Sequence, residues 1–132
     1  MTAGVKRRTF VVATLVGGSL QFRAWAAPAL KMIYVGGWDC QPCTAWKNKY
    51  KAGWLASPEY QKITWIEVEA PKLKEAYQER FWPADLKPVL DQLPRKSGTP
   101  RFLIVRDGKV IANEVGSGQW TKVLAELRKQ LE

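Results

Sequence analysis

The chain divides into short apolar runs and longer segments whose apolar residues recur at helical spacing. Short runs rich in β-branched and aromatic side chains are typical of strands. Strands are therefore predicted over residues 30–35, 63–68, 101–105 and 110–115. Apolar side chains that recur every three or four residues predict helices over residues 40–54 and 119–131. Prolines at 71 and 83, near possible helix starts, and at 94, after a possible helix end, predict two short helices over residues 72–81 and 84–93. This order of elements favours an α/β fold with one mixed central sheet flanked by helices.

The first 26 residues have the three parts of a signal peptide. Lys-Arg-Arg at residues 6–8 forms the basic start, residues 9–20 form a mildly apolar run, and Ala-Trp-Ala at residues 24–26 fits a cleavage site. The apolar run is shorter than the roughly 20 residues that span a bilayer. The basic start and the Thr-Phe-Val after it resemble a bacterial twin-arginine export signal, with an ordinary secretory signal or an uncleaved anchor as the alternatives.

Beyond this segment we expect one exported domain over residues 27–132, released into the periplasm by cleavage near Ala26. The chain carries 21 Lys and Arg against 12 Asp and Glu, and four of the basic residues lie within the first 26 positions. The remaining positive charges are scattered, whereas a nucleic-acid surface requires clustered ones, so no nucleic-acid partner is expected. The chain has no histidine, which excludes Cys–His and Ser–His–Asp catalysis and histidine-containing zinc sites.

The two cysteines, Cys40 and Cys43, are spaced Cys-x-x-Cys at the start of a predicted helix. A helix N-terminus favours a negative sulfur, and the thiolate is the form that attacks disulfides. We expect an exposed Cys40 to attack first and a more buried Cys43 to resolve the mixed disulfide. A purely structural disulfide is disfavoured because so small a loop constrains the unfolded chain little. Zinc needs four ligands, but a copper-carrying thiol pair remains an alternative because thiolates suit soft metals.

Two segments resemble the thioredoxin family. Trp-Asp-Cys-Gln-Pro-Cys at residues 38–43, after an apolar strand, resembles the family's W-C-G-P-C active site. Residues 98–110 begin with Gly-Thr-Pro and continue as strand, Asp-Gly turn and strand, which resembles the family's later half. With the glycine at 116 and the closing helix, the resemblance covers a little over half of the expected mature chain. It implies a thioredoxin-like fold and protein thiol–disulfide exchange without a cofactor or a bound metal.

The resemblance also implies roles for residues around the cysteines. Pro100 corresponds to the family's cis-proline, which packs beside the two cysteines and belongs to the catalytic set; the alternative is an ordinary trans proline that opens a strand. Thr99 precedes it and offers backbone groups to a substrate strand. Trp38, Gln41 and Pro42 complete the substrate-binding residues that the resemblance implies.

Residues 69–97 depart from the family pattern. They exceed the usual connection before the cis-proline by about 15 residues, more than a normal loop allows. We predict a helical insertion here on the substrate side, preceding the cis-proline. Trp82 and Phe81 then form either a partner-binding lip or apolar contacts that bury the insertion against the sheet.

A second departure lies beneath the cysteines, where the family's buried aspartate is replaced by Tyr34. Alignment of the second strand places Glu67 beside it, since neighbouring strands lie about 4.8 Å apart. We predict that a desolvated Glu67, without a lysine partner, accepts the proton of the resolving thiol and so joins the catalytic residues. The alternative is a Glu67 that points to solvent on an alternating strand.

The direction of exchange follows from the charges near the first cysteine. No histidine lies between the cysteines, and Asp39 places a negative charge beside Cys40. Like charges disfavour ionisation, so a reductase is favoured over a strong oxidant. We expect a monomer that acts on disulfide-containing exported proteins and receives electrons from a membrane-bound donor.

Overall fold

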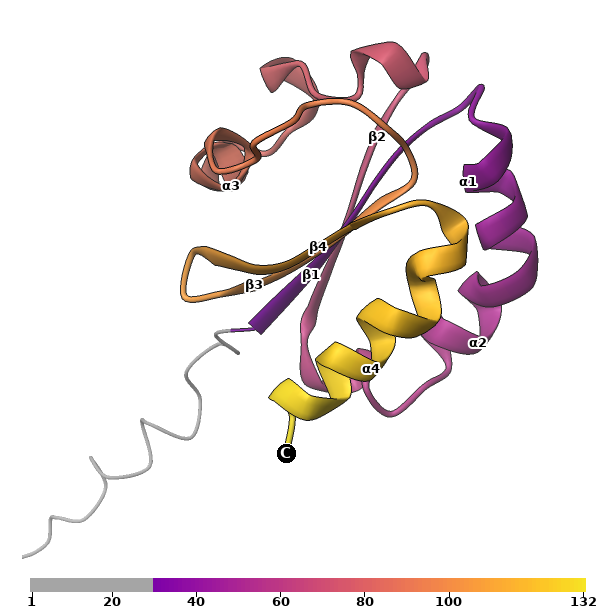
Figure 1. The fold of residues 1–132 in the computed structure, drawn as a ribbon, viewed down its shortest axis with the longest axis vertical. Helices are drawn as coiled ribbons and strands as arrows, with labels where there is room; N and C mark the ends of the chain where they lie inside the picture. Colours follow the sequence, from indigo (N-terminus) through magenta and orange to yellow (C-terminus); the bar gives the residue numbers. More distant parts are fainter. Residues whose placement is uncertain (1–29) are drawn as a thin grey trace, which may run out of the picture.

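Four strands form one mixed sheet with the spatial order β2-β1-β3-β4 (Figure 1). The computed structural model describes residues 30–132, so the predicted signal segment lies outside the described residues. The strands are β1 (Leu30–Gly37), β2 (Thr64–Ala70), β3 (Arg101–Arg106) and β4 (Lys109–Val115). β1 runs parallel to β2 and antiparallel to β3, while β3 and β4 form an antiparallel hairpin. The predicted mixed sheet is confirmed.

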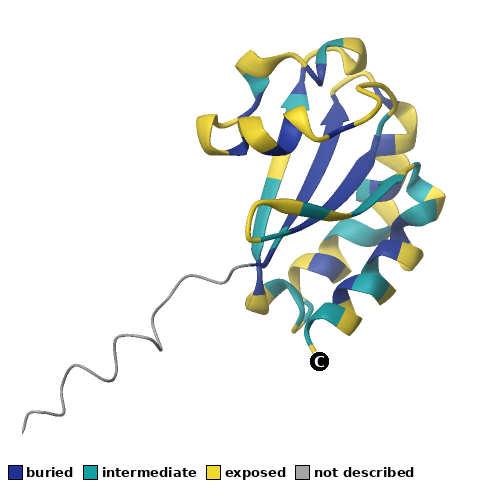
Figure 2. Ribbon diagram, turned by 60° about the vertical axis from the view of Figure 1, so that its left-hand side comes forward, coloured by how far each residue is buried: buried dark blue, intermediate teal, exposed yellow. Residues whose placement is uncertain are grey.

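The central strand β1 separates two apolar cores. Because side chains alternate along a strand, Met32 and Tyr34 face one core while Ile33 and Val35 face the other. All four side chains are fully buried, and Figure 2 shows the middle of the sheet as the most buried part of the molecule. The sequence of a strand that is covered on both faces is a nearly continuous apolar run, and the sequence of β1 has this form.

Three helical segments in succession, followed later by α4, cover one face of the sheet (Figure 1). The chain is helical through α1 (Gln41–Trp46), a π-helical turn (Lys47–Lys51) and α2 (Ala52–Leu55), and α4 spans Trp120–Gln130. The predicted helix after Cys40 is therefore confirmed, with a π turn in its middle. Its aromatic face packs against the sheet in a cluster made of Tyr34, Trp46, Trp54, Trp65, Phe102 and Trp120.

The segment between β2 and β3, predicted as a helical insertion, covers the opposite face with four short helical segments. Three are 3₁₀ turns, Leu73–Glu75, Glu79–Phe81 and Ala84–Leu86, and the last is α3 (Lys87–Asp91). The predicted helix over residues 72–81 is wrong, because Gln78 has extended backbone between the first two turns. The predicted helix over 84–93 is shorter than expected and begins as a 3₁₀ turn. Among residues 30–132, no helix is long and apolar enough to cross a membrane.

Trp82 closes the second core rather than forming a binding lip. Its side chain is 6% exposed, and its indole N–H donates to the Ala76 carbonyl at 2.8 Å. Phe81 is half-buried and packs against the same core. Of the two alternatives for these aromatic residues, the structure shows the second, in which they bury the predicted insertion against the sheet rather than forming a partner-binding lip.

Candidate active site

The cysteine pair lies where β1 turns into α1. Cys40 is the N-cap residue of α1, and its Sγ accepts a hydrogen bond from the Cys43 backbone N–H at 3.1 Å. The two cysteines form a disulfide with their Cα atoms 5.2 Å apart. Pro42 occupies the first helical turn, where its missing N–H has no intrahelical partner to lose. The sequence therefore holds both sulfurs on one turn, as the spacing predicts.

Both cysteines are almost fully buried in this disulfide form. Cys40 and Cys43 are each 1% exposed, so the prediction of an exposed Cys40 is wrong for this state. One covering group is Thr99, whose hydroxyl donates to Cys40 Sγ at 3.2 Å. Trp38, two residues before Cys40, is 71% exposed and leaves a large apolar side chain in solvent beside the pair.

The loop that carries Thr99 has the predicted cis peptide bond, between Thr99 and Pro100. Gly98 precedes it with φ of +96°, and a Cβ added there would lie 2.9 Å from a methyl group of Val115. The left-handed backbone and the close approach both require glycine at this position. The Gly116 N–H donates to the Pro100 carbonyl at 2.7 Å and fixes the loop to the end of β4.

A buried arginine organises the same loop. Arg101 is 3% exposed, and its guanidinium donates to the Tyr77 hydroxyl, to Asn113 Oδ1 and to the carbonyls of Arg95 and Ser97 at 2.7–2.8 Å. All four acceptors are formally neutral. Arg101 thereby ties the insertion and β4 to the residues just before Thr99.

Tyr77 completes this arrangement from the insertion side. Its hydroxyl accepts from Arg101 and donates to the Gly98 carbonyl at 2.5 Å. Burial raises the pKa of Tyr77, and the nearby guanidinium of Arg101 opposes part of that rise. Sequence reasoning missed Arg101 and Tyr77. The available signal was a charged residue at the start of an otherwise apolar strand.

The insertion also contacts the loop before Cys40. Asp39 Oδ1 accepts a hydrogen bond from the Leu73 backbone N–H at 2.7 Å. A Cβ added to Gly37 would lie 2.5 Å from Leu73 Cα, so glycine allows the two backbones to meet. Leu73 is 38% exposed and lies beside the loop that carries Trp38. The start of the insertion, rather than Trp82, therefore borders the site.

Glu67 does not have the environment predicted for it. It pairs with Tyr34 in the strand register as expected. Its carboxylate, however, accepts from Lys51 Nζ at 3.0 Å and from the indole N–H of Trp65 at 3.0 Å, and the residue is exposed. The predicted lysine-free and desolvated carboxylate is therefore wrong at this position.

The carboxylate that meets Tyr34 is Glu69, two residues further along β2. The Tyr34 hydroxyl donates to Glu69 Oε2 at 2.9 Å, and Lys47 Nζ lies 2.5 Å from the same oxygen. Burial raises the pKa of Tyr34 above its usual range, and the negative charge of Glu69 adds to the rise. Tyr34 therefore keeps its proton at any physiological pH.

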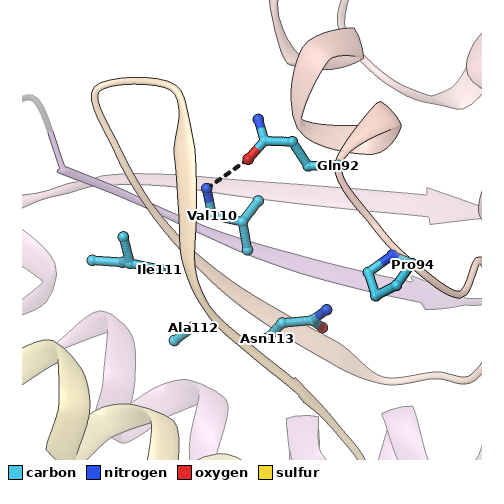
Figure 3. Close-up of a pocket in the computed structure, with 6 residues that line it drawn as sticks. All are labelled: Gln92, Pro94, Val110, Ile111, Ala112 and Asn113. Carbon is cyan, nitrogen blue, oxygen red and sulfur yellow. Dashed lines mark hydrogen bonds between the residues drawn. The ribbon is translucent and has the colours of Figure 1, made fainter.

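A separate pocket of about 280 Å³ lies between the end of α3 and β4 (Figure 3). Its lining residues are Gln92, Pro94, Val110, Ile111, Ala112 and Asn113, none of which titrates near neutral pH. Gln92 uses its side-chain amide to bind the hairpin, accepting from the Val110 N–H at 2.9 Å and donating to the Gly108 carbonyl at 2.7 Å. The pocket holds no group for nucleophilic or acid–base chemistry.

Metal-binding groups are sparse in the described part of the chain. Residues 30–132 contain no group of three or more His, Cys, Asp or Glu side chains placed to hold a metal ion. The cysteine pair supplies two soft ligands only when it is reduced.

No family model and no curated protein matches the chain. Solved structures do match it. The periplasmic thioredoxin SoxS from Paracoccus pantotrophus is 17% identical with a TM-score of 0.56, and the match covers 78% of this chain and 99% of that one. The short form of spinach chloroplast thioredoxin f is 18% identical with a TM-score of 0.53, covering 92% and 91%. Thioredoxin f2, solved in complex with ferredoxin:thioredoxin reductase, is 20% identical with a TM-score of 0.53, covering 81% and 82%. At this identity the likeness establishes the thioredoxin fold alone, and it confirms the predicted fold class.

Proposed function

We propose that this chain is a protein thiol–disulfide oxidoreductase that works through Cys40 and Cys43. The observation that carries the proposal is the position of the disulfide at the start of α1, against the cis peptide between Thr99 and Pro100. A disulfide that closes a loop of so few residues does little for stability. Its place on a thioredoxin fold supports a redox role instead.

Cys40 is the attacking sulfur in this mechanism. In the disulfide form its Sγ already accepts from the Cys43 N–H and from the Thr99 hydroxyl. Both donors favour a thiolate once the pair is reduced, because hydrogen bonds to the charged form lower a thiol's pKa. The thiolate attacks a partner disulfide, forms a mixed disulfide and releases one partner sulfur as a thiolate.

Cys43 then attacks Cys40 Sγ and releases the second partner sulfur. The protein dithiol becomes the disulfide seen here, and the partner disulfide becomes a dithiol, so two electrons pass to the partner. The 5.2 Å separation of the Cα atoms allows the intramolecular bond without movement of the helix.

The partner segment binds across the surface formed by the residues around the buried pair. Trp38 offers the largest exposed apolar side chain there, and Gln41 and Pro42 are exposed in the first turn of α1. Thr99 lies against the attacking sulfur, so the backbone of the cis-proline loop borders the same surface. We assign substrate binding to these four residues and the positioning of the loop to Pro100.

The proposed setting is the periplasm, with disulfide-containing exported proteins as substrates and a single copy of the chain as the active form. One structural neighbour, SoxS, is a periplasmic thioredoxin, and another thioredoxin is solved in complex with a reductase. A reductase that works outside the inner membrane needs a supply of electrons, so a membrane-bound donor is part of the proposal. The negative charge of Asp39 beside Cys40 supports a reductase rather than an oxidase.

The test is covalent trapping. In the Cys43→Ser variant the mixed disulfide on Cys40 has no intramolecular exit, so partner proteins stay attached and can be identified by mass spectrometry. The matched control is Cys40→Ser, which should trap little. Adducts that form on Cys43 alone would reverse the assignment of the two sulfurs.

A second assay separates exchange from metal carriage. The wild-type chain should accelerate the reduction of insulin by dithiothreitol, and the double Cys→Ser variant should not. One-to-one binding of Cu(I) without any acceleration would instead support the copper-carrier alternative.

A further inference from the structure

The resolving step requires a route for a proton out of the protein interior. Cys43 is 1% exposed in the disulfide form, so its sulfur has almost no contact with bulk water there. The Cys43 thiol must lose its proton as it attacks, because the thiolate is the nucleophile. A hydrogen-bonding group within reach of Cys43 Sγ is therefore needed.

The Tyr34 hydroxyl lies next to that sulfur, in space that Gly36 leaves open. A Cβ added to Gly36 would lie 2.1 Å from the Tyr34 hydroxyl oxygen and 3.1 Å from Cys43 Sγ. The oxygen and the sulfur are therefore separated by no more than the sum of these two distances. A separation within this upper limit can be spanned by one bridging water molecule.

Tyr34 is suited to pass a proton on rather than to hold one. The side chain is fully buried, and its ring stacks on Trp46 with the centroids 5.1 Å apart. Because burial and Glu69 raise the pKa of Tyr34, its hydroxyl stays protonated and donates to Glu69 Oε2. The lone pairs of the same oxygen remain free to accept from a neighbouring thiol.

Glu69 connects this hydroxyl to the surface. Its side chain is 20% exposed and is held by Lys47, whose side chain is 32% exposed. On the same strand, Glu67 is held by Lys51. The two lysines lie four residues apart on the π turn and the two glutamates lie two apart on the strand, and each lysine binds one glutamate.

We propose that Tyr34 and Glu69 form a proton relay for Cys43, with Lys47 positioning the carboxylate. This inference rests on the proposed function. As Cys43 Sγ bonds to Cys40 Sγ, the thiol proton passes to the Tyr34 oxygen and the Tyr34 hydroxyl proton passes to Glu69. The partner sulfur leaves as a thiolate, and Glu69 returns its proton to solvent. The charged and titratable groups around the relay are Lys47 on the helix and, beside Glu69 on β2, Glu67 with its partner Lys51.

The test measures the two chemical steps separately. Reduced protein is mixed with a disulfide-bonded model peptide, quenched with acid at intervals, and analysed by intact mass for the covalent adduct. Growth of the adduct reports attack by Cys40, and its decay reports resolution by Cys43. Glu69→Gln keeps the shape of the side chain, and Tyr34→Phe keeps the ring, so each removes one member of the relay.

Both variants should slow resolution at neutral pH by at least about tenfold, leave attack unchanged, and move the pH dependence of resolution to more alkaline pH. Glu67→Gln is the matched control, and it should leave both steps as in wild type. The relay is refuted if Glu69→Gln and Tyr34→Phe keep the wild-type pH dependence, or if Glu67→Gln slows resolution equally. If the wild-type protein forms no adduct at all, the proposed function itself is wrong, and the relay with it.

Discussion

Replacing Arg101 with methionine should destabilise the protein by about 3 kcal/mol. The guanidinium makes four hydrogen bonds from a buried position, and each bond of a charged group contributes about 1.5–3 kcal/mol net. Two acceptors, the carbonyls of Arg95 and Ser97, belong to exposed residues and can bind water instead. The loss is therefore dominated by the bonds to Tyr77 and Asn113. Methionine also avoids the cost of burying a cation, which offsets part of the lost free energy of unfolding, so the expected loss lies at the lower end of the range for these two bonds.

Urea unfolding followed by circular dichroism measures this loss. With an m-value of about 1–3 kcal/mol/M, the midpoint should fall by about 1–3 M. Arg95→Met is the matched control, because the exposed Arg95 takes part through its backbone carbonyl. It should change stability by less than about 0.5 kcal/mol. A loss below about 1 kcal/mol for Arg101→Met, or equal losses for the two variants, would refute the assigned role of the buried guanidinium.

Three further measurements test other parts of the structure. Stability should fall above about pH 10, because burial raises the pKa of Tyr34 and Tyr77 and the unfolded chain then loses protons that the folded protein keeps. The expected slope from Tyr34 is about 1.4 kcal/mol per pH unit, and Tyr34→Phe should remove this contribution in urea unfolding measured at a series of pH values. Gly36→Ala should cost about 1–3 kcal/mol, since its Cβ would overlap the Tyr34 hydroxyl, whereas Gly53→Ala meets no atom and should be neutral or stabilising in thermal unfolding. The reduction potential of the cysteine pair, measured by equilibration with glutathione, should lie nearer about −270 mV than about −120 mV. Asp39→Asn should raise this potential, because it stabilises the Cys40 thiolate. A wild-type potential above about −150 mV would contradict a reductase.

The sheet and the cysteine site could be predicted because their signals are local. Each strand is a run of apolar or β-branched residues, and the cis bond before Pro100 follows a recognisable Gly-Thr-Pro segment. The sequence predicts one helix over residues 72–81, but tertiary contacts determine the backbone conformation of this segment and interrupt the helix. Extended Gln78 lets Tyr77 reach the cis-proline loop while Trp82 folds back onto Ala76.

Whether Glu67 or Glu69 meets Tyr34 depends on where the second strand ends. The predicted strand ended at residue 68, whereas β2 continues to Ala70, whose carbonyl accepts from the Trp38 N–H at 3.0 Å. Alternation placed Glu67 on the correct face of the sheet, but Glu69 lies on that face too. The π turn carries both lysines, and each binds one glutamate: Lys47 binds Glu69 and Lys51 binds Glu67. No local sequence pattern predicts such a pairing.

The direction of β1 has a practical consequence for attaching this protein to something else. Leu30 pairs with Arg106 in the sheet, and Arg106 donates to the Gln130 carbonyl at 3.0 Å, so the start of β1 and the end of α4 meet at one pole (Figure 1). The cysteines follow the other end of β1, roughly 23 Å away at the usual rise per residue. A fusion protein, an affinity tag or an electrode linker joined near Leu30 or near the end of α4 would therefore lie at the end of the sheet opposite the cysteine pair and Trp38.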